Sequence, residues 1–333
     1  MSTRRAGESA NGHNAVSLSR RLRLAQFTVF EKIVETGSLL AASRELSLSQ
    51  PAVSKSMQEL EHQLGGSLFT RGKNGITLTE LGHRFARHAR SMLAGLQDMA
   101  EDMNALQSGN TGRVVVGTML AATVGLLPES IVRLREGAAD IVVTVQVGPN
   151  EVLFPTLARG ELDLVVGFLP TNASTLMREA GPHARFMHVP LYDEDLSAVV
   201  GREHPLAQAE RVDVAELRRF DWIIPTPGSA VYPAVRSFFE SHHLAMPRRR
   251  VESISILTNL GLLTRQPMVA LMPRSVAVSL SASGLTRMLP LPDLGPVGTV
   301  GYTLRAQRVP TVAGAHFISA LHAVADELGH RSL

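Results

Sequence analysis

The chain has 333 residues, of which 44% are hydrophobic and 19% are charged, and it contains no cysteine. This length predicts two domains or three small ones, and the composition is that of a globular protein rather than a fibrous or disordered one. The absence of cysteine excludes a disulfide scaffold, a thiolate zinc site, an iron–sulfur cluster and a cysteine nucleophile.

The positive charge is concentrated at the front of the chain. Residues 1–90 contain 13 Lys or Arg and 7 Asp or Glu, so the remainder of this +3 chain has a net charge of −3. A basic N-terminal region followed by a mildly acidic remainder favours a polyanion-binding module joined to a domain with a second function. Residues 1–20 lack the apolar core of a secretory signal, and we interpret them as a disordered extension. No run is apolar enough to span a membrane, so we expect a soluble, cytoplasmic protein.

Residues 21–79 have the pattern of three helices followed by a hairpin. Apolar residues recur at helical spacing over 24–34, and Gly37 ends that run. Ser38 is suited to cap a second short helix over 39–46. A third helix is predicted to begin after Ser49, with Pro51 in its first turn, where a missing N–H costs nothing.

The third helix separates into two faces. Val53, Met57, Leu60 and Leu64 form its buried stripe. Three helices with a tight turn before the last are the arrangement in which that helix enters the DNA major groove. The alternative is an ordinary solvated helix face. The outward residues, which we predict to contact DNA, are Gln50, Pro51, Ser54, Lys55 and Gln58.

Specific roles follow from the chemistry of these side chains. Gln50 can pair with adenine through two hydrogen bonds, and Lys55 can donate to guanine acceptors. Residues 67–70 and 76–78 are predicted strands around Asn74-Gly75, a strong hairpin signal. Arg71 and Lys73 on this wing would reach backbone phosphates, giving affinity rather than sequence choice.

This region resembles the N-terminal signature of LysR-type transcriptional regulators. The resemblance implies an N-terminal winged helix-turn-helix, a long linker helix and a C-terminal α/β two-lobed effector domain like a periplasmic binding protein. Lys55 stands where the family more often has Arg, and Thr70 where an acidic residue is usual. The matching residues are Gly37-Ser38, Ala41-Ala42, Leu46-Ser47, Ser49 to Lys55, Leu60-Glu61, Leu64-Gly65, Leu68-Phe69, Arg71, Leu78-Thr79 and Gly82.

Residues 80–107 form a predicted long amphipathic helix with a narrow apolar stripe. A second subunit is the obvious partner for this stripe, as in the linker helix of the family. The alternative is that the helix packs on its own chain's C-terminal domain. His88 lies in the stripe and fits a packed residue better than a metal ligand. The predicted dimer residues are Leu81, Phe85, Met92, Leu96, Met99 and Met103.

Residues 113–333 alternate between strand and helix patterns and predict a parallel sheet covered on both faces. Predicted strands cover 113–117, 141–147, 162–166, 196–200, 222–225 and 268–272, and predicted helices cover 124–135, 151–159 and 231–242. In such sheets ligands bind beyond the carboxyl ends of the strands. Each candidate could equally be an ordinary turn or cap. The candidate effector-binding residues are Thr118, Met119, Gly167, Phe168, Thr226 and Ser229.

The C-terminal half also resembles the family's effector-binding domain. The resemblance implies one lobe of about 113–187 and 290–333 and a second of about 188–289, with a co-inducer between them. Residues 157–163 and 262–273 resemble the subgroup of galactose-binding-protein and protocatechuate-pathway regulators. A sugar or an aromatic or other organic acid is the implied effector. Promoter DNA, a second copy of the chain in a dimer or tetramer, and RNA polymerase are the implied partners.

Two other classes of function compete with a regulator. An enzyme is disfavoured because the chain has no Gly-x-Ser-x-Gly elbow, Walker loop or His-Glu-x-x-His. His242-His243 is better explained as a solvated pair than as a catalytic one. A constitutive architectural DNA-binding protein without an effector is the alternative, but it has no need of more than 200 residues of α/β domain. We predict a ligand-responsive, nucleoid-associated bacterial regulator with no cofactor, no metal and no catalytic residues.

Overall fold

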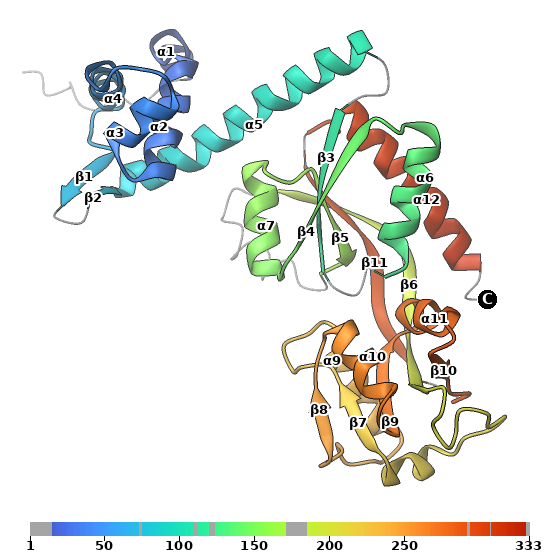
Figure 1. Ribbon diagram of the computed structural model, residues 1–333. Helices are drawn as coiled ribbons and strands as arrows, with labels where there is room; N and C mark the ends of the chain where they lie inside the picture. The colour runs from blue at the N-terminus through green and yellow to red at the C-terminus, as the bar shows by residue number, and fades with distance from the viewer. Residues whose placement is uncertain are drawn as a thin grey trace, which may run out of the picture. The chain divides into compact units, whose positions relative to one another are not determined.

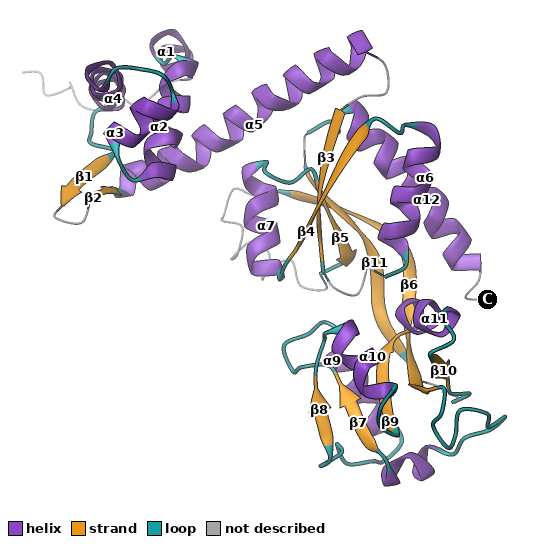
Figure 2. Cartoon of the chain, in the orientation of Figure 1, coloured by secondary structure: helices purple, strands orange, loops and turns teal. Residues whose placement is uncertain are grey.

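The computed structural model describes residues 15–72, 75–108, 112–119, 124–170, 185–291, 294–306 and 308–330. The chain divides into two compact units, Met1–Gln97 and Asp98–Leu333. Helices and strands of both units are drawn in Figure 1 and are coloured by type in Figure 2. Each unit is described by itself.

The first unit is a winged helix-turn-helix. Its elements are α1 (Ala15–Arg21), α2 (Leu24–Thr36), α3 (Leu39–Glu45), α4 (Gln50–Leu64), β1 (Phe69–Gly72), β2 (Gly75–Leu78) and the first part of α5 (Glu80–Ser108). The predicted caps are present: the Ser38 hydroxyl accepts from the Ala41 amide, and the Ser49 hydroxyl accepts from the Ala52 amide. Gly37 and Gly65 end α2 and α4 in the left-handed conformation that glycine adopts without strain.

The N-terminal extension is shorter than predicted. Residues 15–20, expected to be disordered, form most of α1, and the Leu22 that follows packs on the core of the unit. The carbonyl of Leu18 accepts from the amide of Leu22, which joins the end of α1 to this anchor. Residues 1–14 lie outside the described residues.

One aromatic core holds the helices, the wing and α5 together. Phe30 is fully buried and contacts Phe69 of the wing and Phe85 of α5, with ring centroids 5.1 and 4.9 Å apart. A Cβ at Gly82 would overlap the carbonyl oxygen of Leu68, so only glycine allows α5 to begin this close to the chain entering the wing. The first turns of α5 are therefore part of the winged-helix unit.

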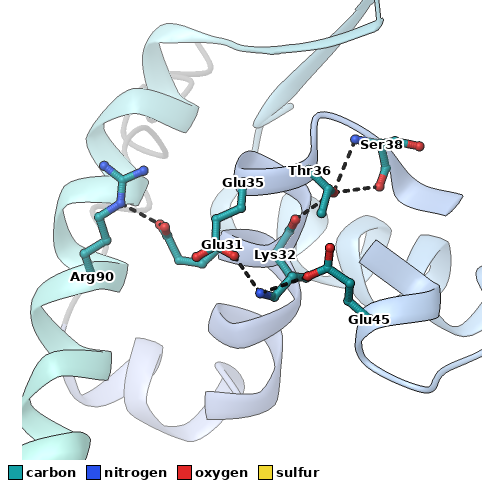
Figure 3. A network of polar contacts seen from close by, with 7 residues as sticks. All are labelled: Glu31, Lys32, Glu35, Thr36, Ser38, Glu45 and Arg90. Atoms are coloured by element: carbon teal, nitrogen blue, oxygen red, sulfur yellow. Dashed lines mark hydrogen bonds and ion pairs between the residues drawn. The ribbon is translucent and has the colours of Figure 1, made fainter. Parts of the chain in front are cut away.

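Polar contacts add to this core, as Figure 3 shows. Arg90 of α5 pairs with Glu31 of α2, with Nε to Oε2 at 2.8 Å, and the side chain of Glu31 is only 12% exposed. Lys32 bridges Glu35 on its own helix and Glu45 on α3, at 2.6 and 3.2 Å. Because the Arg90 pair is largely shielded from water, it contributes more to holding α5 against α2 than an exposed pair would.

The second unit is a two-lobed α/β domain. Its first lobe contains β3 (Gly112–Thr118), α6 (Leu126–Gly137), β4 (Ile141–Val147), α7 (Asn150–Arg159), β5 (Leu164–Phe168) and α12 (Val312–His330). Its second lobe contains a 3-10 helix (Val214–Arg219), β7 (Asp221–Ile224), α9 (Tyr232–Ser241), β8 (Arg250–Glu252), α10 (Ile256–Leu263), β9 (Met268–Pro273), α11 (Arg274–Ala282) and β10 (Thr286–Met288). Two long strands, β6 (Phe186–Gly201) and β11 (Pro296–Arg305), run through both.

The strand order is β4-β3-β5-β11-β6-β9-β7-β8, with β10 beside β6. The pairs β3–β4, β3–β5, β7–β8 and β7–β9 are parallel, as the βαβ pattern predicted, whereas β11 is antiparallel to both β5 and β6. In the first lobe α6 and α12 lie against each other on one face of the sheet and α7 lies on the other (Figure 1).

The chain crosses between the lobes within its long strands. Residues 186–195 of β6 pair with β11, and residues 196–200 pair with β9 of the second lobe. This crossover lies later in the chain than the expected boundary at 188. The return crossover occurs at the start of β11, where the pairing with β6 is irregular between Pro296 and Gly298. The uninterrupted β6 was not predicted, because Pro190 and the acidic residues 193–195 have the composition of a turn.

Candidate functional site

The outer face of α4 is the candidate nucleic-acid interface. Val53, Met57 and Leu60 are buried beneath it, each at most 4% exposed. Proline in the first turn and the Ser49 cap fix where the helix begins. The predicted contact residues Gln50, Pro51, Lys55 and Gln58 are exposed, and Ser54 is half-buried.

The wing is held in a defined position beside α4. The carboxylate of Glu61 on α4 accepts from the backbone amides of Leu68 and Phe69, at 2.7 and 3.4 Å. The strands pair Thr70 with Thr77, whose hydroxyl oxygens are 2.7 Å apart. Of the two predicted phosphate contacts, Arg71 has a backbone position on β1, opposite Ile76. Lys73 lies outside the described residues.

The apolar residues of α5 fall into two groups. Phe85 is 8% exposed and, together with Leu81 and Leu93, packs into the core of the winged helix. This burial differs from the prediction that Leu81 and Phe85 face a second subunit, because the same 3.6-residue spacing serves both an intramolecular core and an interface. Leu96 is half-buried. The remaining three residues of the predicted stripe are exposed: Met92 at 53%, Met99 at 56% and Met103 at 51%.

A cleft of about 510 Å³ lies between the two lobes of the second unit. Met119, Val147 and Phe168 line it where β3, β4 and β5 end, and Pro225 and Met272 line it at the ends of β7 and β9. Ligands of open α/β sheets bind at such carboxyl ends, and the volume is within the range that accommodates a small molecule.

The structure brings three of the six predicted effector residues together in the cleft. Met119, Phe168 and Ser229 line it. Thr118 does not, because its hydroxyl is buried and donates to the carbonyl of Val166 at 3.0 Å. Gly167 and Thr226 are also not among the lining residues.

Gly167 nevertheless shapes the cleft indirectly. A Cβ at this position would lie 2.6 Å from Cε of Met119, so the glycine gives the Met119 side chain its space. The hydroxyl of Ser229 accepts from the Tyr232 amide in the first turn of α9, at 3.2 Å.

Other lining residues were not predicted from the sequence. Asn259 is 9% exposed on α10, its Nδ2 donates to the Ser253 carbonyl at 3.4 Å, and its buried Oδ1 has no partner among the described residues. Asn150 on α7 also has a buried Oδ1 without a partner in the described part of the chain. Asn150 could have been found from the sequence, because the turn before α7 directly follows a predicted strand. No comparable signal marks Asn259, because the sequence of α10 is mostly apolar and has no polar pattern that indicates a ligand site. The missed lining residues are Val147 to Glu151, Pro225, Gly228, Ala230, Val231, Ser253, Ile254, Ile256, Asn259, Leu271 to Pro273 and Val276.

A buried carboxylate lies near the crossover between the lobes. Glu194 on β6 is 4% exposed, and its Oε1 accepts from the Ser275 amide at the start of α11, at 3.0 Å. Burial raises the pKa of Glu194 above its ordinary value, and the hydrogen bonds from Ser275 only partly oppose this effect. Burial also raises the pKa of the neighbouring Tyr192. The crossover strand is thereby joined to the second lobe by a polar contact shielded from water.

Two other kinds of site are absent from the described residues. No group of three or more His, Cys, Asp or Glu side chains there has the geometry to hold a metal ion. None of the helices there is both long and apolar enough to cross a membrane.

An exposed helix-turn-helix face in one unit and a two-lobed cleft of ligand size in the other define a DNA-binding protein with a small-molecule domain. Residues 24–83 match the description "Bacterial regulatory helix-turn-helix protein, lysR family", and residues 107–326 match "LysR substrate binding domain". The chain belongs to the LysR family of transcriptional regulators. It is a DNA-binding transcriptional regulator with an effector-binding domain.

Comparisons with individual proteins agree with this assignment. The chain is 29% identical over 317 residues to the HTH-type transcriptional regulator GbpR of Azospirillum brasilense, covering 95% of this chain and 90% of that protein. It is 27% identical over 313 residues to the regulator PcaQ of Agrobacterium fabrum, covering 93% and 97%.

Solved structures share the fold. A full-length single-residue variant of OxyR from Pseudomonas aeruginosa is similar with a TM-score of 0.64 at 22% identity, covering 91% of this chain and 97% of that one. CbnR in complex with its target DNA is similar with a TM-score of 0.62 at 19% identity, covering 91% and 100%.

Proposed function

We propose that the exposed face of α4 selects the operator in the promoter region this protein regulates. Gln50, Ser54 and Lys55 contact base edges, with Pro51 and Gln58 beside them. Arg71 and Lys73 on the wing contact phosphates. The observation that supports this assignment most strongly is the exposure of Gln50, Pro51, Lys55 and Gln58 directly above a well-packed core.

The active form is an oligomer of identical chains. Three exposed methionines on α5, from Met92 to Met103, provide an apolar face that is costly to leave in water, and a second copy of the same helix is a partner of matching shape. A two-fold dimer presents two α4 helices and so favours an operator with two related half-sites. RNA polymerase is the further partner through which binding acts on transcription, and the protein acts in the cytoplasm, on the nucleoid.

The effector binds in the cleft between the lobes, in contact with Met119, Phe168 and Ser229. A ligand that favours one separation of the lobes shifts the population between two arrangements and so changes how the oligomer holds DNA. A constitutive architectural role in DNA binding is the second candidate, but a protein with that role binds no effector and would not use the cleft.

Selection of bound sequences from a pool of random duplexes tests the DNA-binding part of this proposal. Purified full-length protein is expected to enrich an interrupted inverted repeat. Retention of duplexes without any enriched sequence, with strong dependence on salt, would favour the architectural role instead.

A further inference from the structure

We infer that the first turn of α11 is a latch between the two lobes: Ser275, held by Tyr192 and Glu194 of the crossover strand β6, fixes one separation of the lobes, and its release permits the other. This inference deepens the regulation proposed above and rests on the proposal that the lobes have two arrangements. The latch is the contact that distinguishes those arrangements, and the ionisation of Glu194 biases the choice between them.

The junction between the lobes is narrow. Among the described residues two strands, β6 and β11, run through both lobes, and β6 changes partner at the junction: residues up to Asp195 pair with β11, and residues from Leu196 pair with β9. On β11 the pairing is irregular between Pro296 and Gly298, and Gly298 lies opposite Glu194. An interrupted ladder with a glycine leaves the backbone less restrained here than in the strands on either side. A side-chain contact beside this junction can therefore set the angle between the lobes.

Ser275 joins the second lobe to this junction. It lies in the first turn of α11, and its amide donates to Oε1 of Glu194 at 3.0 Å. Its side chain is hydrogen-bonded to both Glu194 and Tyr192. Tyr192 in turn packs against the core of the first lobe. The second lobe, the crossover strand and the first lobe therefore meet at one serine.

The same part of α11 also contacts the start of α6 in the first lobe. A Cβ at Gly125 would lie 3.9 Å from Cβ of Ser275 and 3.7 Å from Oγ of Ser279, which is ordinary van der Waals contact. The preceding residue, Val124, packs on the second-lobe core that contains Val276. The lobes therefore touch through α11 as well as through the crossover strands.

The latch adjoins the cleft. Met272 and Pro273 at the end of β9 and Val276 on α11, on either side of Ser275 in the chain, line the cleft. A molecule that fills the cleft contacts the segment that carries the latch, and a change in lobe separation moves the same segment. Occupancy of the cleft and the angle between the lobes are coupled at this point.

Release of the latch changes the surroundings of one ionisable group. Glu194 is 4% exposed while its carboxylate accepts from Ser275, and burial raises its pKa. Separation of α11 from β6 admits water, so the carboxylate then ionises near its ordinary pKa. Because the latched form binds this proton more tightly, it is favoured at low pH, and the preference is lost as pH rises through the raised pKa.

The neighbouring polar groups do not reverse this effect. Asp195 raises the pKa of Glu194 further by repulsion, and the backbone amide of Arg274 on α11 opposes the shift only in part. Burial also raises the pKa of Tyr192, so its hydroxyl stays protonated between pH 5 and pH 8. Asp193 is exposed and accepts from Thr299 of β11, at 2.7 Å.

The experiment measures the lobe separation in the full-length protein. Because the chain has no cysteine, Arg135→Cys on α6 and Arg236→Cys on α9 place one spin label on each lobe, both at exposed positions. Labelled protein is diluted with unlabelled protein, so that distances within one chain dominate. Double electron–electron resonance is recorded at pH 5 and pH 8 without effector or DNA. We expect two distance populations, with the ratio of latched to released protein higher at pH 5 by a factor of about three or more.

Variants assign this response to Glu194. Glu194→Gln keeps an acceptor for the Ser275 amide but cannot ionise, so it is expected to retain the latched distance equally at both pH values. Glu194→Ala lacks the acceptor and is expected to give mainly the released distance at both. Asp195→Asn removes the exposed carboxylate at the adjacent position and is the control, which should still respond to pH.

The comparison of wild type with Glu194→Gln decides the inference even where Glu194→Ala does not fold. A wild-type distance distribution that is the same at both pH values, or that changes equally in Glu194→Gln, would overturn the latch. Since neither DNA nor effector is present, that result leaves the proposed function standing. Failure of the proposed function has a different signature, which is DNA binding that no compound alters.

Discussion

At the scale of single residues, α4 illustrates how exposure and function are connected. Gln50 and Lys55 are exposed while Val53 between them is fully buried, so the helix is anchored by one face and is free to contact DNA with the other. A side chain on such a face alters recognition with little effect on folding.

We predict that Gln50→Ala relaxes sequence choice by about 1–3 kcal/mol of discrimination, because a paired contact to a base edge is lost. The measurement is fluorescence anisotropy with the selected operator and with a substituted operator. Arg71→Ala is the comparison. Loss of a phosphate contact is expected to weaken binding to every DNA sequence and to lower the slope of log binding constant against log salt concentration by about one. If Gln50→Ala weakened both duplexes equally, its base-reading role would be wrong.

A second prediction concerns the ion pair in Figure 3. Arg90→Met should destabilise the winged-helix unit by about 1–3 kcal/mol, because the largely buried Glu31 loses its guanidinium partner. Arg84→Met is the matched control, since the Arg84–Glu80 pair on the same helix is exposed and contributes little. Urea unfolding of both variants gives the comparison. Equal stabilities would mean that Arg90 does not hold α5 in place.

At the scale of elements, α5 has two roles along its length. Its first turns complete the core of the winged helix through Phe85 and Ala89, whereas its second half exposes methionines. Flexible, polarizable methionine side chains pack well against a partner of the same kind. The boundary between these two roles lies near Met92.

We predict that Met99→Asp converts the oligomer to smaller species, because association would bury an unpaired carboxylate. Gln97→Asp introduces the same charge at an exposed position on nearly the opposite side of the helix and should leave the mass unchanged. Light scattering at several protein concentrations measures both. An unchanged mass for Met99→Asp would contradict the proposed interface.

The crossover strand β6 leads to a prediction about pH. Because burial raises the pKa of Glu194, the folded state binds this proton more tightly than the unfolded chain does. Its stabilising contribution is therefore present below the ordinary carboxyl pKa and is lost as pH rises through the raised value. Glu194→Gln, which is neutral at every pH, should become more stable relative to wild type between pH 5 and pH 8, by about 1.4 kcal/mol for each unit of raised pKa.

Denaturant unfolding at the two pH values provides the measurement. Asp195→Asn removes an exposed carboxylate from the adjacent position of the same strand and serves as control. A difference between wild type and Glu194→Gln that did not change with pH, or changed as much in Asp195→Asn, would contradict the role of burial.

At the scale of the whole molecule, the sequence predicted those helices and strands whose formation depends mainly on neighbouring residues. The helices of the first unit were predictable because Ser38, Ser49, Gly37 and Gly65 act on their immediate neighbours. The parallel strands of the first lobe were predictable because their apolar runs alternate with amphipathic helices. These features need no knowledge of the rest of the chain.

Features that depend on distant residues were predicted less well. The route of β6 through both lobes depends on pairing with β11, which is about a hundred residues later in the chain. Asn259 became a cleft residue only because the topology brings α10 opposite α7. Thr118 follows the right strand, but its hydroxyl turns to the neighbouring backbone instead of the cleft.

We propose that this regulator selects a DNA site and that a small molecule in its cleft changes how the oligomer holds that site. Footprinting on the DNA upstream of its own gene, at two salt concentrations and with and without a panel of sugars and aromatic acids, tests both parts together. We expect a protected interrupted inverted repeat whose extent changes with one of these compounds. Salt-sensitive protection without a preferred site, unchanged by every compound, would contradict it.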